Sequence, residues 1–124
     1  MPVVRAADAV VHTLHGAHFT SYAGSASGSR ELCAWRLDMP GGVTGVAHRI
    51  TREEVFWVLA GTFRATVDGH SSDLVTGDVL IAPASSSLRL DTPGESPAAA
   101  WVTTGVGLEA VFDDGSRVTP PWAA

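Results

Sequence analysis

The sequence has little of the chemistry that would tie it to a secreted or membrane protein. Cys33 is the only cysteine among 124 residues, so no disulfide can form within the chain and an apolar core must hold the fold. No apolar run is long enough to span a bilayer. The N-terminus lacks the basic-then-apolar pattern of a secretion signal, because Val10 and Val11 are followed at once by His12. We therefore expect a cytoplasmic protein without a membrane partner.

Positive charge is also scarce. The chain has no lysine, and its 8 arginines face 13 acidic residues, which gives a formal net charge of −5. The arginines are scattered along the sequence and form no basic cluster. A nucleic-acid partner and an anionic membrane surface are therefore not expected.

A sustained helical period is absent as well. Turn residues recur about every 8–12 positions, which is typical of an all-β sandwich or barrel. The length suits a single domain over residues 1–124 with one core.

Alternating apolar and polar positions predict individual strands and their buried faces. The segment Glu54–Leu59 is apolar on both faces, so we expect it inside a sheet with Trp57 buried. Further extended segments are predicted over Val43–Ile50, Ala98–Val106 and Leu108–Phe112.

Two glycine-containing motifs stand out in the central half of the chain. In Gly42–Gly61, five residues separate Gly42 from His48, and a further five separate His48 from Glu54. This spacing resembles the first motif of the cupins, and the stretch 77–92 resembles the second. The resemblance implies a double-stranded β-helix, or jelly roll, with a pocket inside the barrel.

The same resemblance implies a metal site. In the cupin family two histidines and a glutamate of the first motif and a histidine of the second hold the metal. In this sequence those four positions are His48, Ile50, Glu54 and Leu88, so two of the four ligand types are replaced by alkyl side chains.

The chemistry of His48 and Glu54, which we place on neighbouring strands of a hairpin, is open to three interpretations. As metal ligands they would leave several positions to water, so zinc, manganese, iron or nickel would be held weakly. Without a metal, the carboxylate would orient the imidazole and the pair would serve as general acid or base. In the third interpretation they are a remnant without chemistry. The cofactor expected is accordingly none, or a weakly held divalent metal.

Three apolar residues are expected to line the pocket. Ile50 and Leu88 replace nitrogen ligands by groups that exclude water, although ordinary core filling would explain them as well. Phe56 lies two residues after Glu54 and shares its strand face.

A histidine cluster near the N-terminus is a further candidate. Three histidines, His12, His15 and His18, are spaced three apart around Gly16. On an extended segment alternate residues face opposite sides, so the three can approach one site only if the chain turns at Gly16.

The family resemblance does not select a reaction, because cupins include dioxygenases, isomerases, lyases, cyclases and non-catalytic binding domains. We expect a small-molecule-binding cupin with an incomplete metal site, in which His48 and Glu54 would act on an apolar substrate if the protein is an enzyme. One alternative is a metal-dependent enzyme, of dioxygenase, isomerase or cyclase type, whose missing ligands come from elsewhere. Another is a non-catalytic binding or regulatory module. Tryptophan-rich strands and open sheet edges predict a homodimer.

Overall fold

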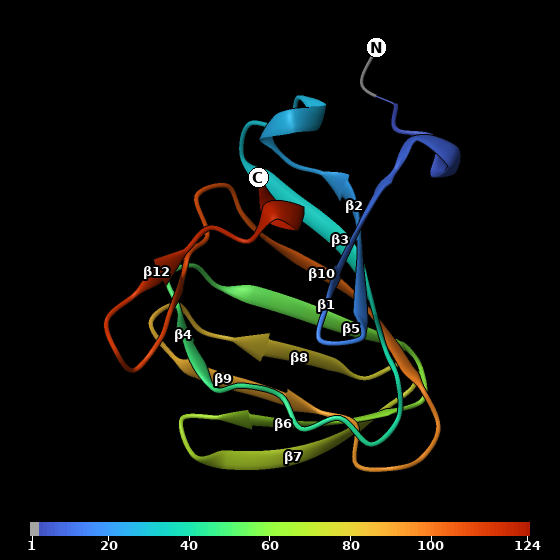
Figure 1. Ribbon diagram of the computed structural model, residues 1–124, viewed down its shortest axis with the longest axis vertical. Helices are drawn as coiled ribbons and strands as arrows, with labels where there is room; N and C mark the ends of the chain where they lie inside the picture. The colour runs from blue at the N-terminus through green and yellow to red at the C-terminus, as the bar shows by residue number, and fades with distance from the viewer. Residues whose placement is uncertain (1–2) are drawn as a thin grey trace.

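The computed structural model describes residues 3–124, which form two antiparallel sheets of six strands each (Figure 1). The first sheet has the order β1 (Val10–Leu14), β2 (Ala17–Ala23), β3 (Leu32–Met39), β10 (Ala98–Gly105), β5 (Glu54–Ala60) and β8 (Val79–Ala82). The second has the order β12 (Arg117–Val118), β11 (Ala110–Val111), β4 (His48–Ile50), β9 (Ser87–Asp91), β6 (Thr62–Val67) and β7 (His70–Val75). The predicted all-β jelly roll is confirmed.

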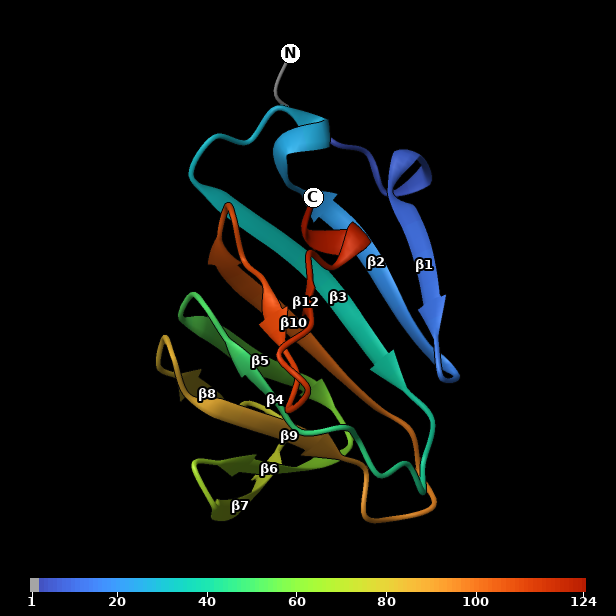
Figure 2. The same cartoon turned by 60° about the vertical axis from the view of Figure 1, so that its left-hand side comes forward.

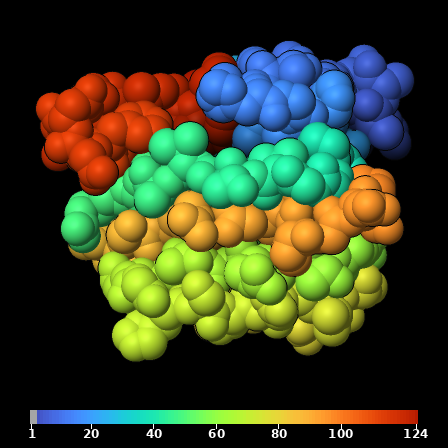
Figure 3. Space-filling view, turned by 60° about the horizontal axis from the view of Figure 1, so that its bottom comes forward, coloured from blue at the N-terminus to red at the C-terminus, as the bar shows by residue number. Residues whose placement is uncertain are grey.

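Helical structure in the described residues is limited to three short 3-10 helices, η1 (Ala6–Asp8), η2 (Ser25–Ser27) and η3 (Pro121–Ala123). Within residues 3–124 we find no helix with the length and hydropathy needed to cross a membrane. Figure 2 shows η3 lying close to β2 and β3, and in Figure 3 the N-terminal hairpin and the C-terminal tail lie side by side. The β1–β2 hairpin and η3 therefore cover the same end of the molecule.

The core lies between the two sheets and is built from registered rows of inward-facing side chains. On the first sheet, Trp35, Val102 and Phe56 are successive cross-strand partners on β3, β10 and β5, and all three are buried. On the second sheet, Phe63 and Leu88 are almost fully buried. Each such side chain contributes about 1.5–3 kcal/mol by leaving water.

Two tight turns explain how neighbouring strands are paired. Asp68 and Gly69 have φ angles of 48° and 83°, as a two-residue turn of type I′ requires, and they join β6 to β7 as their sequence predicts. His15 and Gly16, at 51° and 80°, join β1 to β2 in the same way. The turn at Gly16 brings the N-terminal histidines back over the barrel.

Two predicted strands are shorter than expected. Only residues 48–50 of Val43–Ile50 form a strand; before it, the amides of Val43 and Gly45 bond to the side chains of Thr92 and Asp91 instead of to a neighbouring backbone. The predicted strand Leu108–Phe112 is reduced to β11, because the left-handed Gly107 turns the chain and the amide of Glu109 is taken by the Thr51 hydroxyl.

The prediction that Trp57 is buried is wrong. β5 does lie inside its sheet, between β10 and β8, but Trp57 is 50% exposed on the outer face. Alternation places Glu54 and Phe56 on the inner face instead, and both are buried. Because both faces of this strand are apolar, hydropathy alone could not tell the inner face from the outer.

Candidate functional site

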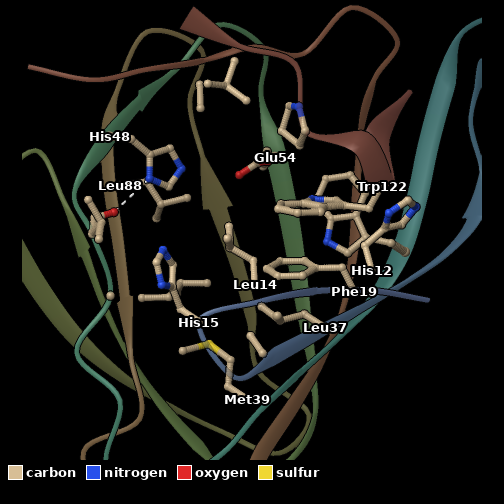
Figure 4. A pocket seen from close by; sticks show the side chains of 18 of the residues that line it. His12, Leu14, His15, Phe19, Leu37, Met39, His48, Glu54, Leu88 and Trp122 are labelled. Carbon is tan, nitrogen blue, oxygen red and sulfur yellow. Dashed lines mark hydrogen bonds between the residues drawn. The ribbon is translucent and has the colours of Figure 1, made fainter. Parts of the chain in front are cut away.

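A cavity of about 1080 Å³ lies between the sheets, on the side where the N-terminal hairpin and the C-terminal tail close the molecule (Figure 4). Its walls are mainly aliphatic and aromatic. The polar exceptions that could transfer a proton are the carboxyl groups of Glu54 and Glu109 and the imidazoles of His12, His15 and His48.

Glu54 opens β5 and points into the cavity from the first sheet (Figure 4). Its cross-strand partners are Thr104 on β10 and Ala82 on β8. The Thr104 hydroxyl donates to the carbonyl of Glu53 at 2.7 Å, so it is turned away from the carboxyl group. Among residues 3–124 no side chain or backbone group hydrogen-bonds to the Glu54 carboxyl.

The surroundings of Glu54 change its proton affinity. Its residue is only 5% exposed, and this burial raises the pKa of the Glu54 carboxyl to about 8. Among residues 3–124 no cation opposes the effect of desolvation. At neutral pH the group is therefore mainly a neutral carboxylic acid, able to donate one hydrogen bond into the cavity.

His48 opens β4 and projects into the cavity from the second sheet (Figure 4). Its Nδ1 lies 2.9 Å from the carbonyl oxygen of Val46. A carbonyl oxygen can only accept, so Nδ1 carries the proton, and Nε2 of the neutral ring is left as an acceptor. The ring of Phe112 lies 6.0 Å away between centroids and packs at a tilt.

His48 and Glu54 are not neighbours on one hairpin, contrary to the sequence interpretation. They lie on opposite sheets and face the cavity from two sides, with no hydrogen bond between them. The chain changes sheets at residues 51–53, where the amide of Thr51 bonds to the carbonyl of Glu109. A carboxyl that orients the imidazole directly is therefore ruled out in this structure.

The other predicted pocket residues lie where the motif spacing suggests. The cavity is lined by Ile50 from β4, Leu88 from β9 and Phe56 from β5. Leu88 is the direct cross-strand partner of His48. The side chains at positions 48, 50, 54 and 88 are thus brought to one cavity.

The N-terminal histidines divide between the two faces of their hairpin. His12 and His15 reach the cavity, whereas His18 lies outside it and shares a 3.3 Å hydrogen bond with Thr13. The sequence analysis did not identify Trp122 of η3 as a residue of the cavity wall. Its ring stacks on Phe19, with the ring centroids 3.7 Å apart, and closes one end of the cavity. The only sequence signal was a tryptophan after two prolines, in a segment interpreted as a tail.

The residues present do not fit a resident metal ion. Within residues 3–124 no three or more His, Cys, Asp or Glu side chains are grouped as a metal would require. Ile50 and Leu88 place hydrocarbon where two further donors would be needed, and the nearest donors, on His48 and Glu54, come from opposite walls. Two donors alone make a weak site.

No arginine lines the cavity within the part of the chain that the structure describes, residues 3–124. Three arginines on the surrounding strands are held on the outer surface by aspartates: Arg36 by Asp38, Arg64 by Asp73, and Arg89 by Asp91, at 3.0, 2.8 and 3.1 Å. The cavity therefore offers no permanent cation to an anionic ligand.

The fold defines an all-β jelly-roll protein with a cavity between its two sheets. The model of the family described as "Cupin domain" matches residues 35–105, which is more than half of the chain. The chain belongs to the cupins.

The solved structures to which this chain is similar include proteins named for different activities. An RmlC-like cupin from Shewanella frigidimarina is 19% identical, with a TM-score of 0.72 over 83% of this chain and 88% of that one. The polyketide cyclase RemF from Streptomyces resistomycificus is 13% identical, with a TM-score of 0.76 over 90% and 86%. Salicylate 1,2-dioxygenase from Pseudoaminobacter salicylatoxidans is 16% identical, with a TM-score of 0.66 over 77% of this chain and 26% of that one. No curated protein is significantly similar in sequence. These likenesses show the fold and leave the reaction open.

Proposed function

We propose that this cupin binds a small, uncharged and largely apolar molecule between its sheets, with Glu54 and His48 as the polar contacts. The observation that carries the proposal is the Glu54 carboxyl, which is buried, faces the cavity and has no hydrogen-bond partner within residues 3–124. A ligand oxygen in the cavity can accept the proton of this carboxyl group in a hydrogen bond.

The size and walls of the cavity support an apolar ligand. Small-molecule sites in proteins typically enclose about 300–1,000 Å³, and this cavity of about 1080 Å³ is slightly larger than that range. Phe19, Trp35 and Phe56 supply flat aromatic surface, and Leu88 and Ile50 supply branched aliphatic surface. A ligand of two or more fused rings would fill this space better than a sugar or an amino acid.

The charge of the cavity supports an uncharged ligand. A carboxylate or phosphate would lose its hydration without meeting an arginine, and it would face the Glu54 and Glu109 carboxyl groups. A neutral carbonyl oxygen has no such cost, and it is the natural acceptor for a protonated carboxyl group.

We also propose that the molecule is a cytoplasmic homodimer. The exposed apolar outer face of the first sheet, which includes Trp57, supports self-association. The free thiol of Cys33 supports a reducing compartment. Burial raises the pKa of that thiol, and it donates to the carbonyl oxygen of Ala123, which suits a structural role.

Two ligands of the same shape and different charge test the proposal. Binding of 2-acetylnaphthalene and of 2-naphthoate at pH 7 is measured by titration calorimetry. We expect the neutral ketone to bind at least about tenfold more tightly, which corresponds to about 1.4 kcal/mol.

A variant that fills the cavity provides the control. Leu88→Trp should remove ketone binding, whereas Val75→Trp, on the exposed outer side of β7, should not. Circular dichroism must show that both variants fold. Equal or tighter binding of 2-naphthoate, or undiminished ketone binding by folded Leu88→Trp, would overturn the proposal.

A further inference from the structure

We propose that His48 and Glu54 are a general base and a general acid that together transfer protons on a neutral carbonyl compound, converting a ketone to its enol. The inference rests on the proposed function, because the same cavity must first bind an uncharged apolar molecule. It goes further by assigning a reaction and a substrate class, which are ketones with an acidic C–H next to the carbonyl.

The role of His48 follows from its backbone contact. The Val46 carbonyl fixes the proton on Nδ1, at 2.9 Å, so Nε2 is the only ring nitrogen that can take a proton from a ligand. The Nδ1–H hydrogen bond persists after protonation and strengthens when the ring is positive. His48 is therefore held in the tautomer and orientation of a base.

The role of Glu54 follows from its isolation. The hydroxyl of Thr104, its cross-strand neighbour, donates its hydrogen bond to the Glu53 carbonyl oxygen. The proton of the Glu54 carboxyl has no acceptor among residues 3–124 and is available to a ligand oxygen. The carboxyl is buried in the cavity wall, within reach of a ligand bound between the sheets.

The opposed positions of the two groups suit a concerted transfer. His48 reaches the cavity from the second sheet and Glu54 from the first, with no bond between them, so a flat molecule in between can contact both (Figure 4). Had they been hydrogen-bonded to each other, the proton would pass between them and not through a substrate.

The conversion of the ketone to its enol needs no co-reactant, because His48 and Glu54 accept and donate all the protons involved. His48 Nε2 takes a proton from the carbon next to the carbonyl, and the C–H electron pair becomes the C=C bond of the enol. The carbonyl π pair takes the proton of Glu54 and forms the O–H bond. An imidazolium and a carboxylate remain. Return of a proton from His48 to carbon, and of the enol proton to Glu54, regenerates both groups.

Other titratable groups face the same cavity and must be distinguished from the pair. His12 and His15 approach from the β1–β2 hairpin, and Glu109 approaches near β11, where its carboxylate accepts from Arg117 at 3.2 Å. Glu109 is paired with a cation, whereas Glu54 has no charged partner within residues 3–124. His15 is the competing base that the experiment has to exclude.

Hydrogen exchange in 2-tetralone tests the inference. This neutral ketone has an acidic CH₂ beside its carbonyl, and replacement of those hydrogens by deuterium in D₂O is followed by NMR. General acid and base catalysis typically contributes about 10²–10⁴-fold. We expect the protein to accelerate exchange at least about a hundredfold over buffer near neutral pH.

Matched variants assign the roles. His48→Gln should return exchange to the buffer rate, and Glu54→Gln, which keeps a hydrogen-bond donor but cannot transfer a proton, should slow it at least about tenfold. Exchange is measured at a ketone concentration that saturates each variant in calorimetry, so that a loss of affinity is not counted as a loss of proton transfer. The exposed controls His70→Gln and Glu53→Gln should exchange at the wild-type rate.

The outcomes separate this inference from the proposed function. Binding of 2-tetralone with exchange at the buffer rate overturns the proton transfer and leaves ligand binding standing. Exchange that survives His48→Gln but is lost in His15→Gln assigns the base elsewhere and also overturns the inference. If neither 2-tetralone nor 2-acetylnaphthalene binds, the proposed function itself is wrong.

Discussion

Trp57 of β5 and Trp101 of β10 lie directly opposite each other as cross-strand partners on the outer face of the first sheet. Val79 of β8 extends the row beyond Trp57, and Tyr22 packs against Trp101 with ring centroids 5.4 Å apart. Trp57 and Val79 are 50% and 54% exposed. A contiguous apolar face of this kind commonly marks a protein interface.

The first prediction concerns that face. At micromolar concentration, light scattering should give twice the mass of one chain, because pairing two such faces removes their indoles from water. Trp57→Glu should be monomeric with an unchanged circular dichroism spectrum. The control Val75→Glu, which also places a charge at an exposed apolar position, should stay dimeric. A single-chain mass for the wild type would refute the dimer.

The second prediction compares two adjacent aromatic side chains of β5. Phe56→Ala should lower the free energy of unfolding by about 3–5 kcal/mol, because it leaves a cavity in the core. Trp57→Ala should cost only about 1 kcal/mol in the monomer, since its side chain is half exposed. Denaturant titrations at a concentration low enough to keep the wild type monomeric measure both. The reverse order would mean that the two faces of β5 are assigned wrongly.

The contrast between Phe56 and Trp57 shows where sequence reasoning succeeds and where it stops. Strand content, the turn at Asp68–Gly69 and the cupin motifs are local patterns, and all three were confirmed. Which face of β5 is inside depends on which strands cover it, and those lie far away in sequence.

The candidate site shows the same limit. The motif spacing brought positions 48, 50, 54 and 88 to one cavity as expected, because a jelly roll turns strands at regular intervals. The assignment of His48 and Glu54 to one hairpin was wrong, because the chain passes from one sheet to the other at residues 51–53. The hydropathy pattern of the sequence does not indicate such a change of sheet. The closure of the cavity by Trp122 depends on a stack with Phe19 that joins the two ends of the chain.

The third prediction is a dependence of stability on pH that is specific to Glu54. Its folded pKa of about 8 lies above the ordinary value of 4.5 for a free glutamate side chain, so the folded state binds the proton more tightly than the unfolded state. The stabilising contribution is therefore complete below about pH 4.5. It falls as the pH rises toward 8, because the unfolded chain ionises first.

Replacing Glu54 isolates this contribution. At about 1.4 kcal/mol per pKa unit, the free energy of unfolding should lose a few kcal/mol between pH 5 and pH 8. Glu54→Gln should remove most of that loss, and the exposed control Glu53→Gln should retain it. Denaturant titrations at several pH values give the slopes. Parallel profiles for wild type and Glu54→Gln would contradict the neutral buried carboxyl group.

The last prediction concerns the four motif positions. His48, Ile50, Glu54 and Leu88 all line the cavity, although two of them cannot bind a metal. The wild type should therefore hold zinc or nickel weakly, through two donors at most. The double substitution Ile50→His with Leu88→His supplies two more imidazoles and completes the ligand set of the family.

Calorimetric titration with zinc and nickel compares the double variant with the wild type. We expect affinity to rise by orders of magnitude, with protons released if the ligands begin protonated. The metal-free variant should be less stable, since it buries two polar rings where hydrocarbon was packed. A matched control, His70→Ala in the same double variant, should leave the affinity unchanged, because His70 is exposed at the start of β7. Equal and negligible binding by a folded double variant would mean that the four side chains do not meet, and the motif alignment that places the site would be wrong.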